Sequence, residues 1–305
     1  MRSFKGFKAG LSCAVVDMTP PTRSVPGHLR VLAASALVLA ICLSGLAGTA
    51  QATTTASTLA PPVIHAKAAI LVDMGTGRVL YSHDANACRR MASTTKIMTA
   101  LLVLDTLPLD RVVTVSPRAA GVGEWSLGLK AGDRLTVKQL LYGALVYSAN
   151  DAAFALAEAC SGSMEAFVKK MNQRAAAFGL SNTHYVNPDG LDAPGQYSSA
   201  RDLAILARRA MRNAEFRAIV GTVTYSITLP GQSKPFAFRN VNKLLGTASW
   251  VTGIKTGSTN QAGICLVASG SENGKSVISV VLGEASAPQT WSDSKALLTY
   301  GFKRE

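Results

Sequence analysis

The sequence predicts an α+β fold, in which helices flank an antiparallel β-sheet and a mostly helical lobe is inserted. Three observations indicate this class: two β-rich runs near residue 70, a long middle block with helical periodicity, and a return to β-rich runs after Gly221. Strands do not alternate with helices, so a doubly wound parallel sheet is not favoured. With 48% hydrophobic and 16% charged residues, the chain is also too apolar for a disordered protein.

The N-terminal segment, residues 1–52, is expected to be a signal peptide. Five basic residues and one acid precede an apolar run at residues 31–46, and an Ala-x-Ala triplet at residues 50–52 is a typical cleavage site. The apolar run is about 16 residues long, shorter than the roughly 20 that a membrane-spanning helix needs. We therefore expect an exported protein, with membrane contact only if this segment stays uncleaved. Met18 is an alternative start, and the Thr/Ala/Pro-rich residues 53–65 are expected to be a linker.

Charge and cysteine content narrow the classes of partner. Without residues 1–52 the chain has 26 basic and 17 acidic residues, a net charge of +9, which favours anionic surfaces. The basic residues are scattered and not interleaved with aromatic ones, so we expect no nucleic-acid partner. Cys88, Cys160 and Cys265 remain, either as one disulfide and a thiol or as three thiols. No histidine has metal-binding spacing, so we predict no metal site and no cofactor.

Residues 66–305 are predicted to form one domain that begins with a hairpin and a helix. Runs at residues 66–71 and 78–83 flank a Gly-containing turn, as in a β-hairpin. Residues 91–107 then carry apolar side chains at helical spacing, and Pro108 ends the helix.

The rest of the domain is predicted to be a helical lobe, at about residues 108–220, followed by strands and a closing helix. The predicted helices of the lobe cover residues 140–147, 152–161, 163–178 and 199–213. The predicted strands and the last helix cover residues 222–229, 236–238, 253–255, 263–269, 276–282 and 289–300.

Three short polar motifs are candidates for chemistry. They are Ser93-Thr94-Thr95-Lys96, Ser148-Ala149-Asn150 and Lys255-Thr256-Gly257. Each is weak alone, because the S-x-x-K pattern occurs again from Ser292 and the S-x-N pattern again from Ser271. Their predicted positions are more informative. The first opens a helix, the second lies in a turn between two helices, and the third has its lysine at the end of a strand.

The first motif combines a nucleophile with a base. Residues three apart meet on one face of a helix, so Lys96 can reach the Ser93 hydroxyl. Lysine is a base only as the free amine, and the helix N-terminus and a second cation such as Lys255 would both lower its pKa. The backbone N–H groups of Ser93 and Ser258 would form an oxyanion hole. Gly257 would let the substrate backbone approach the strand closely.

The other two motifs are expected to bind and position substrate. Ser148 would relay a proton to the leaving group, and Asn150 would hold a substrate amide. Lys255, Thr256 and Ser258 offer charge and hydroxyl groups for a terminal carboxylate.

The motifs resemble, in this order, those of the low-molecular-mass D-alanyl-D-alanine carboxypeptidases, the serine DD-peptidases of peptidoglycan maturation. The resemblance extends over residues 66–302 and includes the stretches 187–192 and 195–202. It implies a DD-peptidase/β-lactamase-like fold and removal of the last D-alanine from stem peptides ending in D-Ala-D-Ala. An acyl-enzyme would form on Ser93 with Lys96 as the base, and β-lactams would acylate the same serine and hydrolyse slowly.

The chain departs from this family pattern in two places. Many relatives continue into a β-rich domain with a membrane-binding end, whereas this sequence stops at Glu305, so no such domain is expected. Relatives also often carry an arginine just before the final helix that helps to hold the substrate carboxylate, but residues 283–294 contain no Arg or Lys. Carboxylate binding is then expected to depend more on Thr256, Ser258 and Lys255.

Other activities remain open on the same fold. A β-lactamase needs a carboxylate that activates the deacylating water, and Glu158, Glu165 and Glu215 lack the E-x-x-L-N context of class A enzymes. A noncatalytic wall-binding protein is expected to lose Ser93 or Lys96, and both are present. DD-endopeptidases and transpeptidases use the same residues.

A few conspicuous residues have structural alternatives. Trp125 either lines the substrate groove or packs on the lobe. Asp189 and Asp192 are interpreted as turn and helix-entry residues, because Asn-Pro-Asp-Gly favours a turn. Asp151 is expected to begin a helix, and Cys88 to serve in packing.

Overall fold

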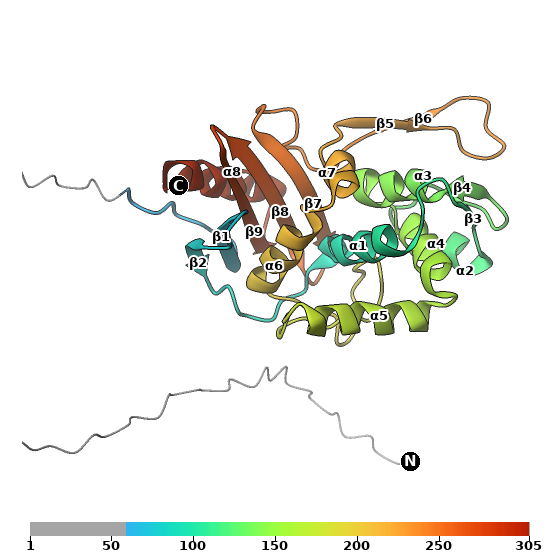
Figure 1. The fold of residues 1–305 in the computed structure, drawn as a ribbon, viewed down its shortest axis with the longest axis horizontal. Helices are drawn as coiled ribbons and strands as arrows, with labels where there is room; N and C mark the ends of the chain where they lie inside the picture. Colours follow the sequence, from blue (N-terminus) through green and yellow to red (C-terminus); the bar gives the residue numbers. More distant parts are fainter. Residues whose placement is uncertain (1–58, 305) are drawn as a thin grey trace, which may run out of the picture. The chain divides into compact units, whose positions relative to one another are not determined.

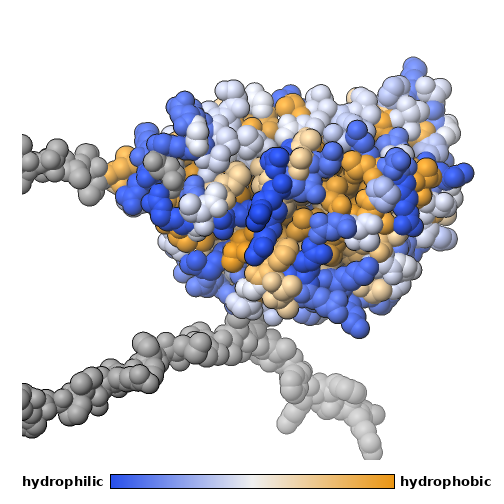
Figure 2. Space-filling view, in the orientation of Figure 1, coloured by the Kyte–Doolittle hydropathy of each residue, from blue (hydrophilic) through white to orange (hydrophobic). Residues whose placement is uncertain are grey.

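The protein is described here by a computed structural model that covers residues 59–304 (Figure 1). The predicted signal peptide and residues 53–58 of the predicted linker lie outside the described residues. In the part of the chain that is described, no helix combines the length and apolarity that crossing a membrane requires. On the face seen in Figure 1, hydrophilic side chains are interspersed with apolar patches (Figure 2).

The main sheet has five strands in the order β2-β1-β9-β8-β7, and every neighbouring pair is antiparallel. The strands are β1 (Ala68–Asp73), β2 (Val79–His83), β7 (Val251–Thr259), β8 (Gly263–Glu272) and β9 (Lys275–Glu284). The predicted hairpin and the predicted strands at residues 253–255, 263–269 and 276–282 thus join in one sheet, which confirms the α+β class with an antiparallel sheet. The predicted strands at residues 222–229 and 236–238 instead form a separate two-stranded sheet. β1 lies between β2 and β9, so the N-terminal hairpin closes one side of the sheet.

Both faces of the sheet are buried. Successive side chains of a strand point to opposite faces. Ile70 and its register partner Val280 belong to the core shared with the helical block, whereas the next residues, Leu71 and Val281, belong to a second core that includes Leu297. The second core is closed by α8 (Ala287–Arg304), which packs against β1, β8 and β9. The first core is closed partly by α6 (Ala200–Ala210), which packs against β1 and β9.

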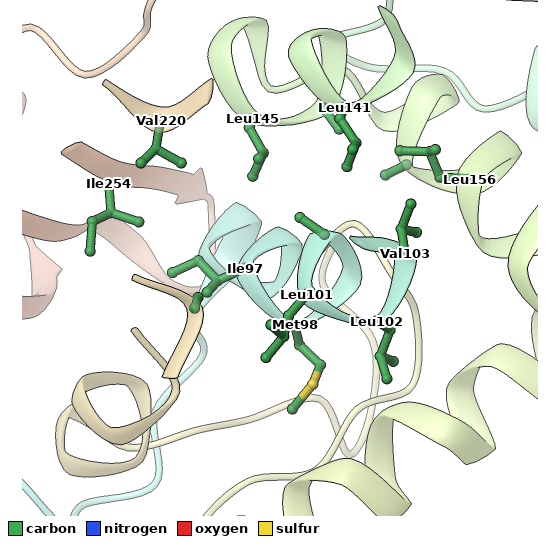
Figure 3. Packing of buried hydrophobic residues seen from close by; sticks show 14 of the residues in the cluster. Ile97, Met98, Leu101, Leu102, Val103, Leu141, Leu145, Leu156, Val220 and Ile254 are labelled. Atoms are coloured by element: carbon green, nitrogen blue, oxygen red, sulfur yellow. The ribbon is translucent and has the colours of Figure 1, made fainter. Parts of the chain in front are cut away.

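Helix α1 (Lys96–Thr106) runs through the first core. A single 3₁₀ turn, Ala92–Thr95, precedes it, so the predicted helix at residues 91–107 has an irregular first turn. Ile97 and Met98 are fully buried. Figure 3 shows apolar side chains around α1, among them Leu141, Leu145, Leu156, Val220 and Ile254. The start of α1 is therefore held by packing on several sides.

The helical block contains more elements than the sequence pattern predicted. Its helices are α2 (Pro117–Ala120), α3 (Val137–Tyr142), α4 (Asn150–Ser161), α5 (Met164–Ala177) and α7 (Ala214–Val220). Two small sheets accompany them, β3 (Val112–Thr114) with β4 (Arg134–Thr136), and β5 (Thr224–Ile227) with β6 (Phe236–Arg239). The predicted helix at residues 140–147 splits into the end of α3 and a π-helical segment, Gly143–Tyr147.

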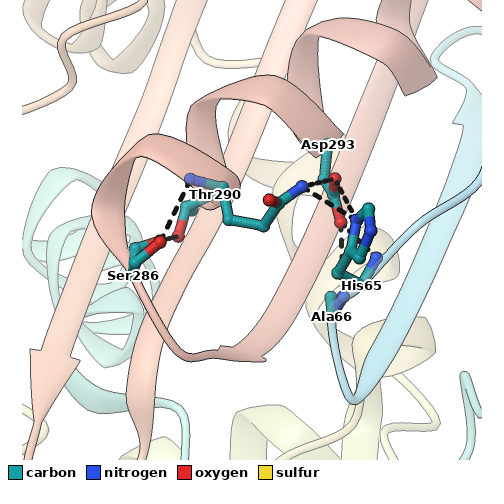
Figure 4. A network of polar contacts seen from close by, with 6 residues as sticks. His65, Ala66, Ser286, Thr290 and Asp293 are labelled. Carbon is teal, nitrogen blue, oxygen red and sulfur yellow. Dashed lines mark hydrogen bonds and ion pairs between the residues drawn. The ribbon is translucent and has the colours of Figure 1, made fainter.

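The N-terminal entry to β1 is fastened to α8 by one carboxylate. Asp293 accepts hydrogen bonds from the backbone N–H groups of His65 and Ala66 and from the side chain of Gln289 (Figure 4). Burial raises the pKa of Asp293, but these hydrogen bonds outweigh it and leave the pKa below its ordinary value. The neighbouring Glu284 shows the opposite shift, because burial raises its pKa to about 8.

Candidate active site

Ser93 lies in the 3₁₀ turn at the start of α1. Two threonines within the turn stabilise it, because Thr94 Oγ1 donates to Met91 O at 2.7 Å and Thr95 Oγ1 donates to Ala92 O at 2.8 Å. Ala92 has a φ of 48°, in the left-handed region that few non-glycine residues adopt. The backbone that leads into Ser93 is therefore specially shaped, a feature that often accompanies functional sites.

Lys96 lies fully buried beside Ser93. Its Nζ is 2.8 Å from Ser93 Oγ, 2.6 Å from Asn150 Oδ1 and 2.8 Å from the backbone oxygen of Asp189. Burial lowers the pKa of Lys96 to about 8, although the charges of Asp189 and Asp151 act in the other direction. With a pKa of about 8, roughly a tenth of the Lys96 amine is free at pH 7 and about half at pH 8. The predicted lowering of the pKa is present, but burial causes it rather than the helix N-terminus or Lys255.

A second serine and lysine meet on the other side of the site. Lys255 Nζ donates to Ser148 Oγ at 2.8 Å and to Thr256 O at 3.0 Å. Burial, together with the nearby charge of Lys96, holds the pKa of Lys255 well below its ordinary value. Ser148 lies between the π-helical segment and α4, as predicted, with a φ of 74°. This backbone turn lets a residue between two helices contact the sheet.

The predicted end of the strand that carries Lys255 was wrong, because it was placed too early. We expected it to end a strand at residues 253–255, but β7 continues to Thr259, so Lys255 and Gly257 are both in the middle of the strand. Gly257 does not interrupt β7. In the structure it stays in the sheet ladder, paired with Cys265 of β8.

Gly257 allows β7 to pass close to the turn that carries Ser93. A Cβ at this position would lie 2.8 Å from Ser93 N and 2.9 Å from Met91 O, closer than real Cβ atoms approach. Gly190, with a φ of 93°, is equally tight on the loop at residues 187–192, where a Cβ would lie 1.9 Å from Ala92 O. Two glycines thus let backbone segments pack against the Ser93 turn.

Asn150 links the first pair to the wall of the site. Its Oδ1 accepts from Lys96, and its Nδ2 donates to the backbone oxygen of Glu124 at 2.9 Å. Its neighbour Asp151 is buried and accepts from the N–H groups of Leu127 and Leu129. Asp151 lies in the first turn of α4, one residue after the helix begins, and it also holds the loop at residues 124–130.

The two pairs open into a cleft of about 430 Å³. Its lining includes the predicted residues Ser93, Ser148, Asn150, Thr256, Gly257 and Ser258. It also includes Glu124, Trp125, Leu191, Val241, Lys243, Ile264, Ala287 and Trp291. Trp125 thus lines the cleft while its indole N–H donates to Tyr147 O, which combines the two alternatives left open for it.

Sequence reasoning missed Lys243 and Trp291. Neither belongs to a motif, because Lys243 lies in a loop after β6 and Trp291 on α8, and only the fold brings them to the cleft. The acids weighed for a β-lactamase lie elsewhere. Glu158 accepts from Ser116, and Glu165 pairs with Arg118.

Asp192 lies in a loop and does not begin a helix, since the next helix, α6, starts at Ala200. Asp192 accepts from Thr259 Oγ1 at 2.9 Å and from Gln261 N at 3.2 Å, so it ties a loop to the end of β7. Cys160 and Cys265 are buried free thiols and do not bridge each other. Burial raises the pKa of Cys265 to about 12, so this thiol is unreactive.

An antiparallel sheet with a helical block, and two serine–lysine pairs between them, are features of a class of serine hydrolases. The model of the D-alanyl-D-alanine carboxypeptidase family matches residues 54–286. The chain belongs to this family, which confirms the resemblance noted in its motifs.

Individual relatives agree with this assignment. The chain is 38% identical over 290 residues to the D-alanyl-D-alanine carboxypeptidase of Streptomyces sp. strain K15, covering 90% of this chain and 99% of that protein. It is 37% identical over 244 residues to DacF of Bacillus subtilis, covering 78% of this chain but 62% of the relative's length. The crystal structure of the Streptomyces K15 DD-transpeptidase superposes with a TM-score of 0.76 and 37% identity, covering 80% of this chain and 100% of that one.

Proposed function

We propose that the protein is a serine D-alanyl-D-alanine carboxypeptidase that acts on peptidoglycan stem peptides, with Ser93 as nucleophile and Lys96 as its base. The observation that carries the proposal is the contact of 2.8 Å between Ser93 Oγ and the amine of a buried lysine whose pKa burial lowers to about 8. A hydroxyl becomes a useful nucleophile when a neighbouring base removes its proton, and here the base is poised near the pH at which it must work.

The reaction follows from the positions of the two pairs. Ser93 Oγ attacks the carbonyl carbon of the penultimate D-alanine while Lys96 takes the hydroxyl proton. The C–N bond then breaks, and the terminal D-alanine leaves with the proton that Lys96 had taken, delivered through Ser148. An ester remains on Ser93, and Lys96 is again a free amine. Lys255 orients Ser148 for this transfer. Water attacks the ester with Lys96 again as base, which releases the shortened peptide and restores the serine.

Substrate would extend along β7. Thr256, Gly257 and Ser258 all line the cleft, and the close packing of β7 on the Ser93 turn at Gly257 places this strand beside the nucleophile. The N–H groups of Ser93 and Ser258 are the proposed donors to the oxyanion. Both polar ends of Asn150 are engaged within the protein, so its proposed contact with a substrate amide requires sharing one of these bonds.

The decisive experiment is D-alanine release from a pentapeptide ending in D-Ala-D-Ala, with the full chain and its Ser93→Ala variant side by side. We expect release by the wild type and none by the variant, with equal thermal unfolding midpoints. Labelling by a fluorescent penicillin should likewise disappear in the variant. A variant that still becomes labelled would refute Ser93 as the nucleophile.

A second candidate activity is transfer of the acyl group to an amine. It is favoured by the similarity to a structure described as a DD-transpeptidase, because the same acyl-enzyme serves both reactions. Adding glycylglycine to the pentapeptide assay distinguishes them. A carboxypeptidase would continue to form the tetrapeptide, whereas a transpeptidase would form a new amide with the added amine.

The place of action follows from the substrate. Peptidoglycan lies outside the cytoplasm, and the predicted signal peptide, residues 1–52, would export the enzyme to it. N-terminal sequencing of protein exported by a bacterial host should begin at Thr53. β-Lactams are the expected acylating inhibitors.

A further inference from the structure

The cleft has only one solvent-exposed cation among the described residues that line it. Lys243 is exposed and, within residues 59–304, forms no ion pair and no side-chain hydrogen bond of its own. The other charged residue among these lining residues is Glu124, which is also exposed. An unpaired lysine at the wall of a catalytic cleft is available to a ligand.

The backbone that carries Lys243 is held firmly. Asn242 and Leu244, on either side, are buried, and the Asn242 carboxamide accepts from Leu244 N at 3.2 Å. The backbone N–H of Asn242 donates to Asn240 Oδ1 at 2.9 Å. Lys243 therefore points from an ordered loop, although its own side chain is exposed.

This loop lies on the Ser148 side of the site. The N–H of Val241 donates to the backbone oxygen of Val146, two residues before Ser148, at 3.1 Å. Val241 and Lys243 line the same cleft as Thr256 and Ser258. In the proposed reaction Ser148 delivers a proton to the leaving D-alanine. The terminal D-alanine of the substrate would therefore lie on the same side of the cleft as Lys243.

The two buried lysines are less suited to binding an anion. Lys96 and Lys255 are each engaged by a serine and a backbone oxygen, and burial lowers the pKa of both. The Lys243 side chain is instead exposed to solvent and has no hydrogen-bond partner within residues 59–304. A lysine head group offers three donors. A strongly hydrated, flexible point charge of this kind can follow a carboxylate without fixed bidentate geometry.

We propose that Lys243 binds the C-terminal carboxylate of the substrate and thereby selects peptides with a free terminal carboxylate. This inference rests on the proposed carboxypeptidase function, and Lys243 acts in it as a specificity-determining residue. The carboxylate is one residue beyond the carbonyl attacked by Ser93, about 3.5 Å farther along the chain. The hydroxyls of Thr256 and Ser258 in the same cleft would share the carboxylate with the lysine.

The test pairs changes in the protein with changes in the substrate. Full-length wild type, Lys243→Met and Lys243→Arg are assayed on a tripeptide ending in D-Ala-D-Ala and on its C-terminal amide. We expect Lys243→Met to lower kcat/KM about 10- to 100-fold on the acid and less than about 2-fold on the amide, the range of a charge-assisted hydrogen bond. Lys243→Arg should recover most of the activity on the acid.

Lys234→Met is the matched control, because Lys234 is an exposed lysine outside the cleft. It removes the same charge and should leave both substrates unaffected. Raising the ionic strength should lower kcat/KM of the wild type on the acid and have little effect on Lys243→Met. An equal loss on acid and amide, or no loss on the acid, would overturn the proposal.

The test also separates this inference from the proposed function. If the wild type released no D-alanine from either peptide, the carboxypeptidase assignment would fail. In that case Lys243 is tested by acylation: wild type and Lys243→Met are compared for their rates with a penicillin and with the methyl ester of that penicillin. A loss confined to the free acid supports carboxylate binding by Lys243, and equal rates refute it.

Discussion

The two serine–lysine pairs have the same geometry but different electrostatic surroundings. In each, a buried Nζ is 2.8 Å from a serine Oγ. Lys96 has the charges of Asp189 and Asp151 nearby, which oppose the effect of burial on its pKa. Lys255 has the charge of Lys96 instead, which adds to the effect of burial. Equal distances therefore do not imply equal protonation, and the two lysines are suited to different steps.

The largest expected effect distinguishes the roles of the two pairs. Lys96→Ala should slow penicillin acylation about 10²- to 10⁴-fold, the usual contribution of a general base. Ser148→Ala should slow it less, toward the lower end of that range, because it removes a proton relay and keeps the base. Stopped-flow labelling measures both rates, and thermal melts check folding. An unchanged acylation rate in Lys96→Ala would exclude lysine as the base.

The next effect concerns the strand that brings the second pair to the first. Gly257→Ala would place a Cβ 2.8 Å from Ser93 N, so β7 or the Ser93 turn must shift. We expect a loss of about 1–3 kcal/mol in the free energy of unfolding, as for overpacking, together with slower acylation. Urea titration measures the first and penicillin labelling the second.

Gly123→Ala is the control for that substitution, because a Cβ at Gly123 meets nothing within 4 Å. It should leave stability and labelling close to wild type. If Gly257→Ala were as harmless as Gly123→Ala, close packing of β7 on the Ser93 turn would not matter for function.

The pH dependence of acylation should report the lysine that acts as base. The free amine is required, so the rate should rise about tenfold per pH unit below a pKa of about 8 and level off above it. Penicillin acylation followed between about pH 5.5 and 9.5 gives this profile. A rate independent of pH over this range would mean that the base is already deprotonated at pH 5.5. The pKa of Lys96 would then not be near 8, and the electrostatic difference between Lys96 and Lys255 would be refuted.

A second pH dependence concerns the stability of the folded protein and not the acylation rate. Burial raises the pKa of Glu284 from 4.5 to about 8, so the folded protein binds a proton that the unfolded chain releases above 4.5. Stability should fall as pH rises from about 4.5 to 8, by less than about 1.4 kcal/mol per unit. Denaturant unfolding at several pH values measures this slope.

Glu284→Gln should flatten the slope without changing the pH profile of acylation. Glu272→Gln, at an exposed position on β8, is the control and should keep the wild-type slope. A slope that persisted in Glu284→Gln would assign the titration to another group.

The sequence predicted the fold class and the Ser93–Lys96 pair because both depend on local pattern, whereas the contact of Ser148 with Lys255, 107 residues away, was not predicted. Strand and helix periodicity is local, and S-x-x-K places Ser93 and Lys96 one helical turn apart in any helix. The bounds of β7 were missed because glycine disfavours strands, whereas here Gly257 is required by contact with the Ser93 turn. Such a contact is not visible along the chain.

The walls of the cleft were harder to predict for the same reason. Lys243 and Trp291 reach it only through the path of a loop and the docking of α8. The π-helical segment before Ser148 also has no clear sequence signal, since residues 140–147 read as an ordinary apolar helix. Long-range packing determined these features, and a periodic pattern does not contain it.

The close approach of Gly190 and Gly257 to the Ser93 turn has a consequence for protein engineering. A library aimed at new substrates should leave these two positions unchanged, because any side chain there displaces the nucleophile itself. The exposed positions 124 and 243 can be randomised instead, since their side chains contact solvent and the cleft. The positions that hold the Ser93 turn in place are thus different from the exposed positions of the cleft at which selectivity can be changed.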